Sequence, residues 1–265
     1  MKSCPFGING GEFPDWPVER IVELGVKVGA QFVELPSSRL GGADAAQARE
    51  AAAAAGLAIH VNGLVSALPA AFASARAVQA TYLVVADDAI ERPDASRAES
   101  FAAFRAAVLG LLEAPAHRAM RLALENSIIK VTRLPEDLVE LVRFTGHPRF
   151  GVNFDADNFY NAGVEPFPYA YELLKDHIVH VHAKDSARYN PAVHGSGKRV
   201  LHRAGGNVVC VPLGCGAVNW AGLIARLQTD GYRGPVSLEP HTLPHEMAPG
   251  MEADATYLRR SGLIR

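Results

Sequence analysis

The chain has 265 residues, of which 49% are hydrophobic and 20% are charged. A chain of this length and apolar content can bury a large core, which excludes a disordered protein and a small disulfide-dependent scaffold. Lysine and arginine total 26 and aspartate and glutamate total 28, a formal net charge of −2. The chain therefore lacks the overall basic surplus of a protein dedicated to binding nucleic acid.

No stretch of the sequence has the length and apolarity of a membrane span, so no membrane association is expected. The most apolar stretch, residues 51–73, is interrupted by His60, Asn62 and Pro69. The N-terminal residues lack the apolar core of a signal peptide. Three cysteines without a dense pattern fit a reducing compartment, so we expect a cytoplasmic protein.

Short β-branched or apolar runs alternate with longer amphipathic runs along the chain. Strands are expected at residues 3–8, 32–36, 57–62, 82–86, 121–126, 151–155, 178–185 and 235–240. Helices are expected at residues 17–30, 44–55, 69–80, 94–112, 135–145, 168–174, 219–229 and 253–260. Eight strand–helix units without a dividing linker predict an α/β fold, a single (β/α)₈ TIM barrel that forms one domain over residues 1–265.

One segment is longer than the barrel requires. Residues 186–218 follow the seventh strand, are rich in glycine and are expected to form a long loop on the side where barrel active sites lie. Its basic residues either hold a phosphate or carboxylate group or are simply solvated. They are Arg188, His194, Lys198, Arg199, His202 and Arg203.

Polar residues collect at the carboxyl ends of four successive strands. A parallel barrel strand is buried on both faces, so a carboxylate there is costly unless it is paired or binds a metal. Any one of these residues alone has an ordinary explanation, such as a helix cap or an arginine pair. Together, three carboxylates and one imidazole predict an open site for Mn²⁺, Mg²⁺, Co²⁺ or Zn²⁺. The four are Glu125, Asp155, His182 and Glu239.

Other polar residues near these strand ends have two interpretations each. His180 lies deeper in its strand than His182 and is interpreted as a core histidine rather than a ligand. Glu34 orients a helix or an inner histidine, or takes part in catalysis. Lys184 shares a strand face with His182, so it either points inward toward the substrate or pairs with Asp185 or a glutamate. The expected substrate-binding residues are His60, for which packing is the equal alternative, Asn126, Asn158, Lys184 and Arg188.

Five segments resemble the sugar phosphate isomerase/epimerase family of the xylose-isomerase-like TIM-barrel superfamily. They are ALEN (123–126), GVNFDADNFYNAG (151–163), HIVHVHAKD (177–185), VPLGCGAVNW (211–220) and VSLEP (236–240). The resemblance implies that Glu125, Asp155, His182 and Glu239 bind the metal and that Glu125 and Glu239 are the catalytic acid–base pair. Asn158, where many members have histidine, and Cys215, where an acidic residue is common, leave the subfamily open. Dimers and tetramers are common in the family, so a homo-oligomer is an expectation that rests on the resemblance alone.

These observations predict a divalent-metal-dependent isomerase or epimerase whose partner is a small-molecule sugar or cyclitol. The expected reaction is proton abstraction next to the carbonyl of a ketose or keto-cyclitol, through a metal-bound enediolate. The alternative is a lyase on the same site. That lyase would be a keto-inositol or dehydroshikimate-type dehydratase, or a subunit that cleaves a keto-glycoside together with a partner chain. An apurinic-site endonuclease is disfavoured by the few ligands and the net charge, and a non-catalytic binding protein is the remaining class.

Overall fold

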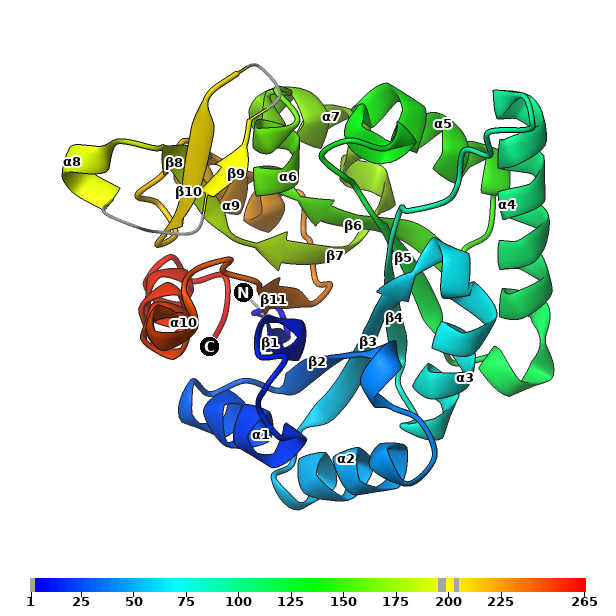
Figure 1. Cartoon of the computed structure of the whole chain (residues 1–265), viewed down its shortest axis with the longest axis horizontal. Coiled ribbons are helices and arrows are strands. Elements are labelled where there is room, and N and C mark those ends of the chain that lie inside the picture. Colours follow the sequence, from blue (N-terminus) through cyan, green and yellow to red (C-terminus); the bar gives the residue numbers. More distant parts are fainter. Residues whose placement is uncertain (1–2, 195–198, 203–204) are drawn as a thin grey trace.

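Eight parallel strands close into a barrel in the order β1–β11–β7–β6–β5–β4–β3–β2, which confirms the predicted (β/α)₈ fold (Figure 1). The structure is a computed structural model that describes residues 3–194, 199–202 and 205–265. The barrel strands are β1 (Phe6–Asn9), β2 (Phe32–Pro36), β3 (Ala58–Leu64), β4 (Tyr82–Ala86), β5 (Arg121–Glu125), β6 (Phe150–Asp155), β7 (Ile178–Ala183) and β11 (Val236–Leu238).

Helices surround the barrel as an outer ring (Figure 1). They are α1 (Val18–Lys27), α2 (Ala43–Ala54), α3 (Leu68–Ala77), α4 (Arg97–Glu113), α5 (Pro135–Thr145), α6 (Ala156–Asn161), α7 (Tyr171–Leu174), α9 (Trp220–Thr229) and α10 (Pro244–Arg260). None of the helices that the structure describes combines the length and the hydropathy of a membrane span.

Two helices differ from the sequence-based expectation. The last helix, α10, begins at Pro244 rather than at residue 253. Pro244 stands in the first turn, where the missing N–H of proline has no partner to lose, whereas Pro249 lies inside the helix. Helix α6 was not expected as a separate element. Asp155 caps it by accepting a hydrogen bond from the backbone N–H of Asn158 at 2.9 Å.

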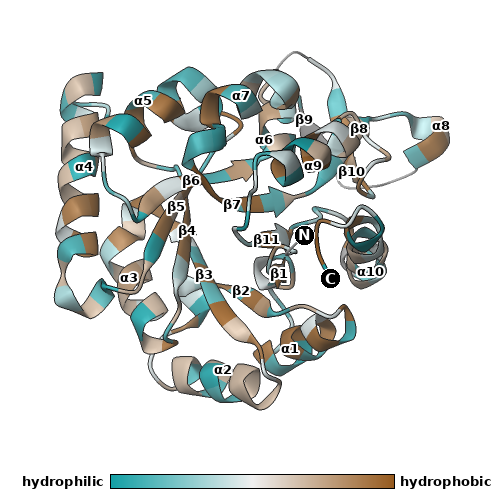
Figure 2. Ribbon diagram, turned by 180° about the vertical axis from the view of Figure 1, so that it is seen from behind, coloured by the Kyte–Doolittle hydropathy of each residue, from teal (hydrophilic) through white to brown (hydrophobic). Residues whose placement is uncertain are grey.

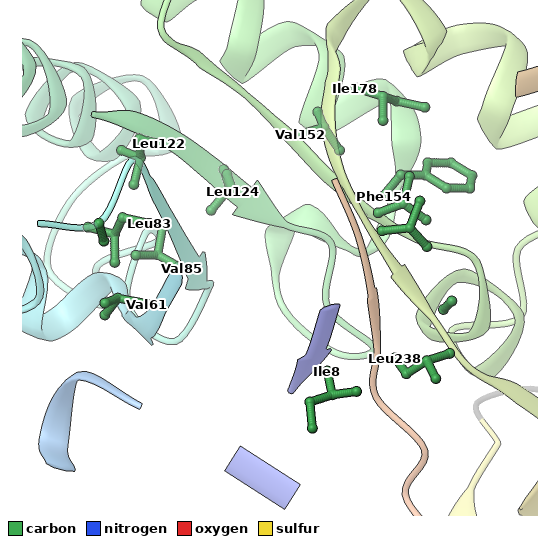
Figure 3. Packing of buried hydrophobic residues seen from close by; sticks show 14 of the residues in the cluster. Ile8, Val61, Leu83, Val85, Leu122, Leu124, Val152, Phe154, Ile178 and Leu238 are labelled. Atoms are coloured by element: carbon green, nitrogen blue, oxygen red, sulfur yellow. The ribbon is translucent and has the colours of Figure 1, made fainter. Parts of the chain in front are cut away.

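Strand side chains alternate between the barrel interior and the helices. The helix-facing positions form the apolar core and are fully buried. Figure 3 shows part of this layer: Val61, Leu83, Val85, Leu122, Leu124, Val152 and Phe154. In Figure 2 hydrophobic colours run along the barrel strands, whereas the surrounding helices mix hydrophobic and hydrophilic segments. The side chains at the other positions of these strands point into the barrel, and at the carboxyl ends of the strands these side chains are polar.

A layer of rings fills the barrel interior beneath those polar ends. His60 stacks on Phe32 with ring centroids 3.8 Å apart, and Tyr82 lies 4.8 Å from His60. Gly7 of β1 makes room for this layer, because a Cβ atom there would lie 2.3 Å from the Phe32 ring. The layer supports the site from below and separates it from the amino ends of the strands.

The segment expected as a long loop forms a three-stranded antiparallel sheet outside the barrel, and we call residues 185–211 the arm. Its strands are β8 (Asp185–Arg188), β9 (Arg199–Leu201) and β10 (Asn207–Val211), in the order β8–β10–β9. A short helix, α8 (Pro191–His194), lies at its outer end (Figure 1). Lys198 and Arg203 of the predicted basic loop lie outside the described residues.

The carboxylate of Asp185 fixes the arm to the barrel. One oxygen accepts hydrogen bonds from the backbone N–H groups of Gly214 and Gly216 at 3.0 and 2.9 Å, and the other accepts from Val218 and Ser186 at 3.1 and 3.0 Å. Position 216 must be glycine, since a Cβ atom there would lie 2.1 Å from Asp185 Oδ1. The buried side chain of Asp185 thus holds the segment that leads from β10 back to α9 in place.

We expect Asp185→Asn to destabilise the protein by about 2–4 kcal/mol, because an amide would turn N–H donors toward buried backbone N–H groups and leave them unpaired. Urea denaturation followed by circular dichroism measures this loss in the free energy of unfolding. Asp176→Asn, on the exposed surface, is the matched control and should change it by less than about 0.5 kcal/mol. Equal stability of the two variants would contradict the anchoring role.

Candidate active site

Four acidic or imidazole side chains meet at the carboxyl end of the barrel. Glu125 ends β5, Asp155 ends β6, His182 lies in β7, and Glu239 follows β11 directly. Asp155 and Ser237 are both register partners of His182, so these three strands present the same level of the barrel to one another. The four residues predicted as metal ligands are therefore neighbours in space.

His182 is the centre of the cluster and is held from both ring nitrogens. Its Nδ1 lies 2.9 Å from Glu125 Oε1 and 3.3 Å from Glu239 Oε2. Its Nε2 lies 3.1 and 3.2 Å from the two carboxylate oxygens of Glu34 on β2. Glu34 therefore orients an inner histidine, which is one of the roles expected from the sequence. With Nε2 donating to Glu34, Nδ1 is left to face Glu125 and Glu239.

His180 occupies the core position that the sequence predicts for it. It is fully buried, and its Nδ1 lies 3.0 Å from Asn153 Oδ1. Its Nε2 lies 3.6 Å from Glu34 Oε2, beyond a normal hydrogen bond. His180 thus packs behind Glu34 and takes no part in the group around Glu125.

Lys184 points into the barrel and joins the carboxylates. Its Nζ lies 2.8 Å from Asp155 Oδ2 and 2.8 Å from Glu239 Oε2. The side chain is 3% exposed. The structure therefore realises the pairing of Lys184 with a glutamate rather than with Asp185, and adds a second pairing with Asp155.

Burial and mutual charge shift the pKa values of this cluster in opposite directions. Burial raises the pKa of Glu125 to about 7, and the neighbouring charge of Glu239 acts in the same direction. Burial also disfavours the ionised form of Glu239, but the charges of His182 and Lys184 outweigh it and hold the pKa of that carboxyl well below its ordinary value. The cluster thus contains more carboxylates than it can readily ionise together.

Two asparagines hold the ligand cluster in place. Asn126 Nδ2 donates to the carbonyl oxygen of Asp155 at 2.9 Å, and its Oδ1 accepts from the Asp155 backbone N–H at 2.8 Å. Asn158 Nδ2 donates to the Asn126 carbonyl oxygen at 2.9 Å and lies 3.5 Å from Glu125 Oε1. These contacts are with the protein itself and fix the position of Asp155.

A cavity of about 430 Å³ opens above the cluster, and Glu125, His182 and Glu239 form part of its wall. Asn9 also lines it and donates from Nδ2 to Glu239 Oε1 at 2.6 Å. Asn62 donates to Asn9 Oδ1 at 2.9 Å. Asn9 is not among the predicted site residues, because the expected first strand, residues 3–8, ends one residue before it. Had the strand been read to its true end, the same rule of polar strand ends would have found Asn9.

The structure places none of the five expected substrate-binding residues in the lining of this cavity. Asn126, Asn158 and Lys184 form hydrogen bonds with other groups of the protein. His60 packs in the ring layer, where burial lowers its pKa to about 3 and keeps it neutral. Arg188 lies in the arm and donates to the carbonyl oxygen of Gly205. Packing is therefore the interpretation of His60 that the structure favours.

Ligand atoms of Glu125, Asp155, His182 and Glu239 lie within 4.8 Å of one another, which makes this group a candidate metal centre. Its donors are carboxylate oxygens and one imidazole nitrogen, and the carboxylates outnumber the nearby cations, so a divalent cation fits both the donor set and the charge. Two further groups satisfy the same distance limit among the described residues. One, Glu34 with His180 and His182, is fully buried, and the other, Glu12 with Glu239 and His241, shares Glu239.

Solved structures with the same fold include enzymes of several kinds. A xylose isomerase-like TIM barrel protein from Mycobacterium smegmatis, in complex with magnesium, superposes with a TM-score of 0.75 at 18% identity, covering 99% of each chain. D-allulose 3-epimerase from Methylomonas sp., in complex with D-allulose, gives 0.75 at 14% identity over 98% of each chain. The probable 3-DHS dehydratase AsbF from Bacillus anthracis gives 0.73 at 18% identity over 98% of this chain and 99% of its own.

A search of curated proteins finds none that matches this sequence. At 14–18% identity the solved structures establish the fold alone. The sequence model of the xylose isomerase-like TIM barrel matches residues 22–261, which is most of the chain. This match includes all four residues of the candidate metal centre, and the chain belongs to the xylose isomerase-like TIM barrel family.

Proposed function

We propose that this chain is a divalent-metal-dependent isomerase or epimerase that acts on a ketose or keto-cyclitol by moving a proton next to the carbonyl. The observation that carries the proposal is the pair of glutamates, Glu125 and Glu239, in the wall of one cavity. Their strands, β5 and β11, are separated in the barrel by β6 and β7, so the two carboxylates reach the cavity from different directions. Both contact the same nitrogen, Nδ1 of His182.

Each glutamate has a role that follows from this placement. One carboxylate removes the proton from the carbon next to the carbonyl, and the other returns a proton from the second direction. Return to the same carbon inverts its configuration, and return to the neighbouring carbon interconverts aldose and ketose. Asn9 and Lys184 hold the Glu239 carboxylate in place through contacts of 2.6 and 2.8 Å.

The residues that would hold the cation are Glu125, Asp155, His182 and Glu239. When bound, a divalent cation supplies a Lewis acid that polarises the carbonyl group and acidifies the neighbouring C–H. Support for this proposal comes from the donor set, from the excess of carboxylates, and from the magnesium complex and the D-allulose 3-epimerase with the same fold.

A lyase that eliminates water is the second candidate. Elimination begins with the same proton removal but also needs an acid for the departing hydroxyl group. Glu125 lies in the cavity wall and burial raises its pKa to about 7, so its carboxyl group is the proton source that suits this step. The probable dehydratase with the same fold supports this alternative. Product analysis separates the two, because only elimination forms a conjugated carbonyl compound that absorbs in the ultraviolet.

We expect Glu125→Gln and Glu239→Gln each to slow the incorporation of solvent deuterium next to the ketose carbonyl by about 10²–10⁴-fold, since an amide cannot accept the proton. Nuclear magnetic resonance of the ketose in D₂O, with metal added back, measures the exchange. Glu246→Gln is the matched control, since Glu246 is exposed on α10, and it should exchange like the unaltered protein. Full exchange in Glu239→Gln would contradict the acid–base assignment.

Metal binding itself should stabilise the protein. After treatment with a chelator, Mn²⁺ or Mg²⁺ at 100 times its dissociation constant is expected to add about 2.7 kcal/mol, because the cation binds only the folded site. The melting temperature should rise by roughly 5–10 °C. Differential scanning fluorimetry measures the rise, which Glu239→Gln should largely remove and Glu246→Gln should retain. No rise with Mn²⁺, Mg²⁺, Co²⁺ or Zn²⁺ would exclude the proposed metal centre.

Glu34 should tune the affinity for the metal although it does not bind it. Glu34→Gln keeps a carbonyl oxygen for His182 Nε2 but removes the negative charge that makes the imidazole a better ligand. We expect the affinity for Mn²⁺ to fall about 10–100-fold. Titration followed by electron paramagnetic resonance measures free Mn²⁺ directly. An unchanged affinity would show that Glu34 does not orient His182 for binding.

A further inference from the structure

The cavity above the metal centre continues beyond the reacting groups and changes in character. Away from Glu125 and Glu239 it runs along the ends of β2 and β3 to the beginning of α3. Apolar side chains dominate its wall there. They are Pro36, Leu64, Ala67 and Ala70, and on β4 Val84 and Ala86 extend the apolar wall back to Glu125, the register partner of Ala86.

Two polar side chains of this part of the wall, Ser74 and Asn62, already have partners in the protein. Ser74 Oγ donates to the carbonyl oxygen of Ser37 at 3.1 Å. Asn62 Nδ2 donates to Asn9 Oδ1 at 2.9 Å. A sugar hydroxyl group placed against such a wall gives up hydrogen bonds to water and finds few in return, which costs binding free energy. This part of the cavity therefore suits an apolar group better than a further stretch of polyol.

The charges that line the cavity disfavour an anionic group. Three carboxylates, Glu12, Glu125 and Glu239, form part of its wall. Among the residues that the structure describes, no lysine or arginine lines it. Lys184 lies beneath the cavity, with its ammonium group 2.8 Å from both Asp155 and Glu239. A phosphate group inside the cavity would therefore lie against carboxylates, without a lysine or arginine among the described lining residues.

Two large apolar side chains are exposed near the rim of the cavity, beside the charged groups of Asp88 and Lys130. Leu64, which lines the cavity, is 47% exposed, and Ile129 on the loop after β5 is 63% exposed. Asp88 links the two segments, because its carboxylate accepts from the Ser66 backbone N–H and its carbonyl oxygen accepts from Lys130 Nζ, both at 2.9 Å. Large apolar side chains exposed beside a cavity commonly mark a surface that contacts a ligand.

We propose that the substrate is an uncharged polyhydroxy ketone that carries an apolar substituent on the side away from the reacting carbons. This inference rests on the proposed function, which places the carbonyl group beside Glu125 and Glu239. The substituent would then lie along α3 and against Leu64.

Three ketoses that differ only at the last carbon test the inference: 6-O-methyl-D-fructose, 6-O-benzyl-D-fructose and D-fructose 6-phosphate. Deuterium incorporation from D₂O next to the carbonyl gives kcat/KM for each, with Mn²⁺ present. We expect the benzyl ether to exceed the methyl ether by about tenfold or more, because its ring is removed from water. The phosphate should fall below both ethers.

Two tryptophan variants on α3 locate the effect. Ala70 is exposed on α3 and lines the apolar part of the cavity, so Ala70→Trp should fill that part and reduce the benzyl-to-methyl ratio to about one. Ala73 is exposed on the same helix but does not line the cavity, and Ala73→Trp should keep the ratio of the unaltered protein. A ratio that is insensitive to Ala70→Trp would place the substituent elsewhere and overturn the inference.

Calorimetric binding of the same three compounds separates this inference from the proposed function. Tighter binding of the benzyl ether without deuterium exchange would sustain the apolar subsite and refute the proposed reaction. Exchange with equal kcat/KM for the two ethers, or a preference for the phosphate, would refute the subsite and leave the reaction standing. Equal binding of all three compounds without any exchange would refute both.

Discussion

The burial of several carboxylates at one end of the barrel is the constraint on which the rest of the site depends. Four carboxylates surround one imidazole and one ammonium group. These six groups come from five different strands or strand ends. The six residues are Glu34, Glu125, Asp155, His182, Lys184 and Glu239. Such a group is stable only if each charge has a partner, so the barrel must hold all of them at once. The asparagines beside Asp155 and Glu239, and the ring layer below, serve this requirement.

The order of the strands and the candidate metal ligands followed from the sequence because one physical rule applies to both. A buried parallel strand is apolar, so its position is visible from composition, and a polar residue at its carboxyl end is conspicuous. This rule located Glu125, Asp155, His182 and Glu239, which the structure brings within 4.8 Å of one another. It also indicated the separate role of His180, because a residue two positions deeper in a strand lies one layer lower in the barrel.

Contacts between distant segments could not be predicted from the sequence. The hydrogen bonds of Asn126 with the Asp155 backbone join residues 29 positions apart, and no local sequence pattern predicts them. The sheet of the arm could not be predicted for a different reason. Its strands are three to five residues long and separated by glycine, which is the composition of a loop. Arg188, predicted to bind the substrate, lies in this arm and donates to the carbonyl oxygen of Gly205. Tertiary pairing, rather than local preference, decides such segments.

The anchoring of Asp185 has a consequence for how the family could diversify. Lys184 belongs to the buried cluster, and the very next residue fastens the arm through four backbone N–H groups. At the other end of β8, the Tyr189 backbone N–H bonds to the Asn207 carbonyl oxygen at 2.8 Å. Residues 189 and 207 are thus joined by a hydrogen bond, and the chain between them leaves and returns at one place. Evolution can lengthen, shorten or exchange it as a module while the chemistry beneath keeps its geometry.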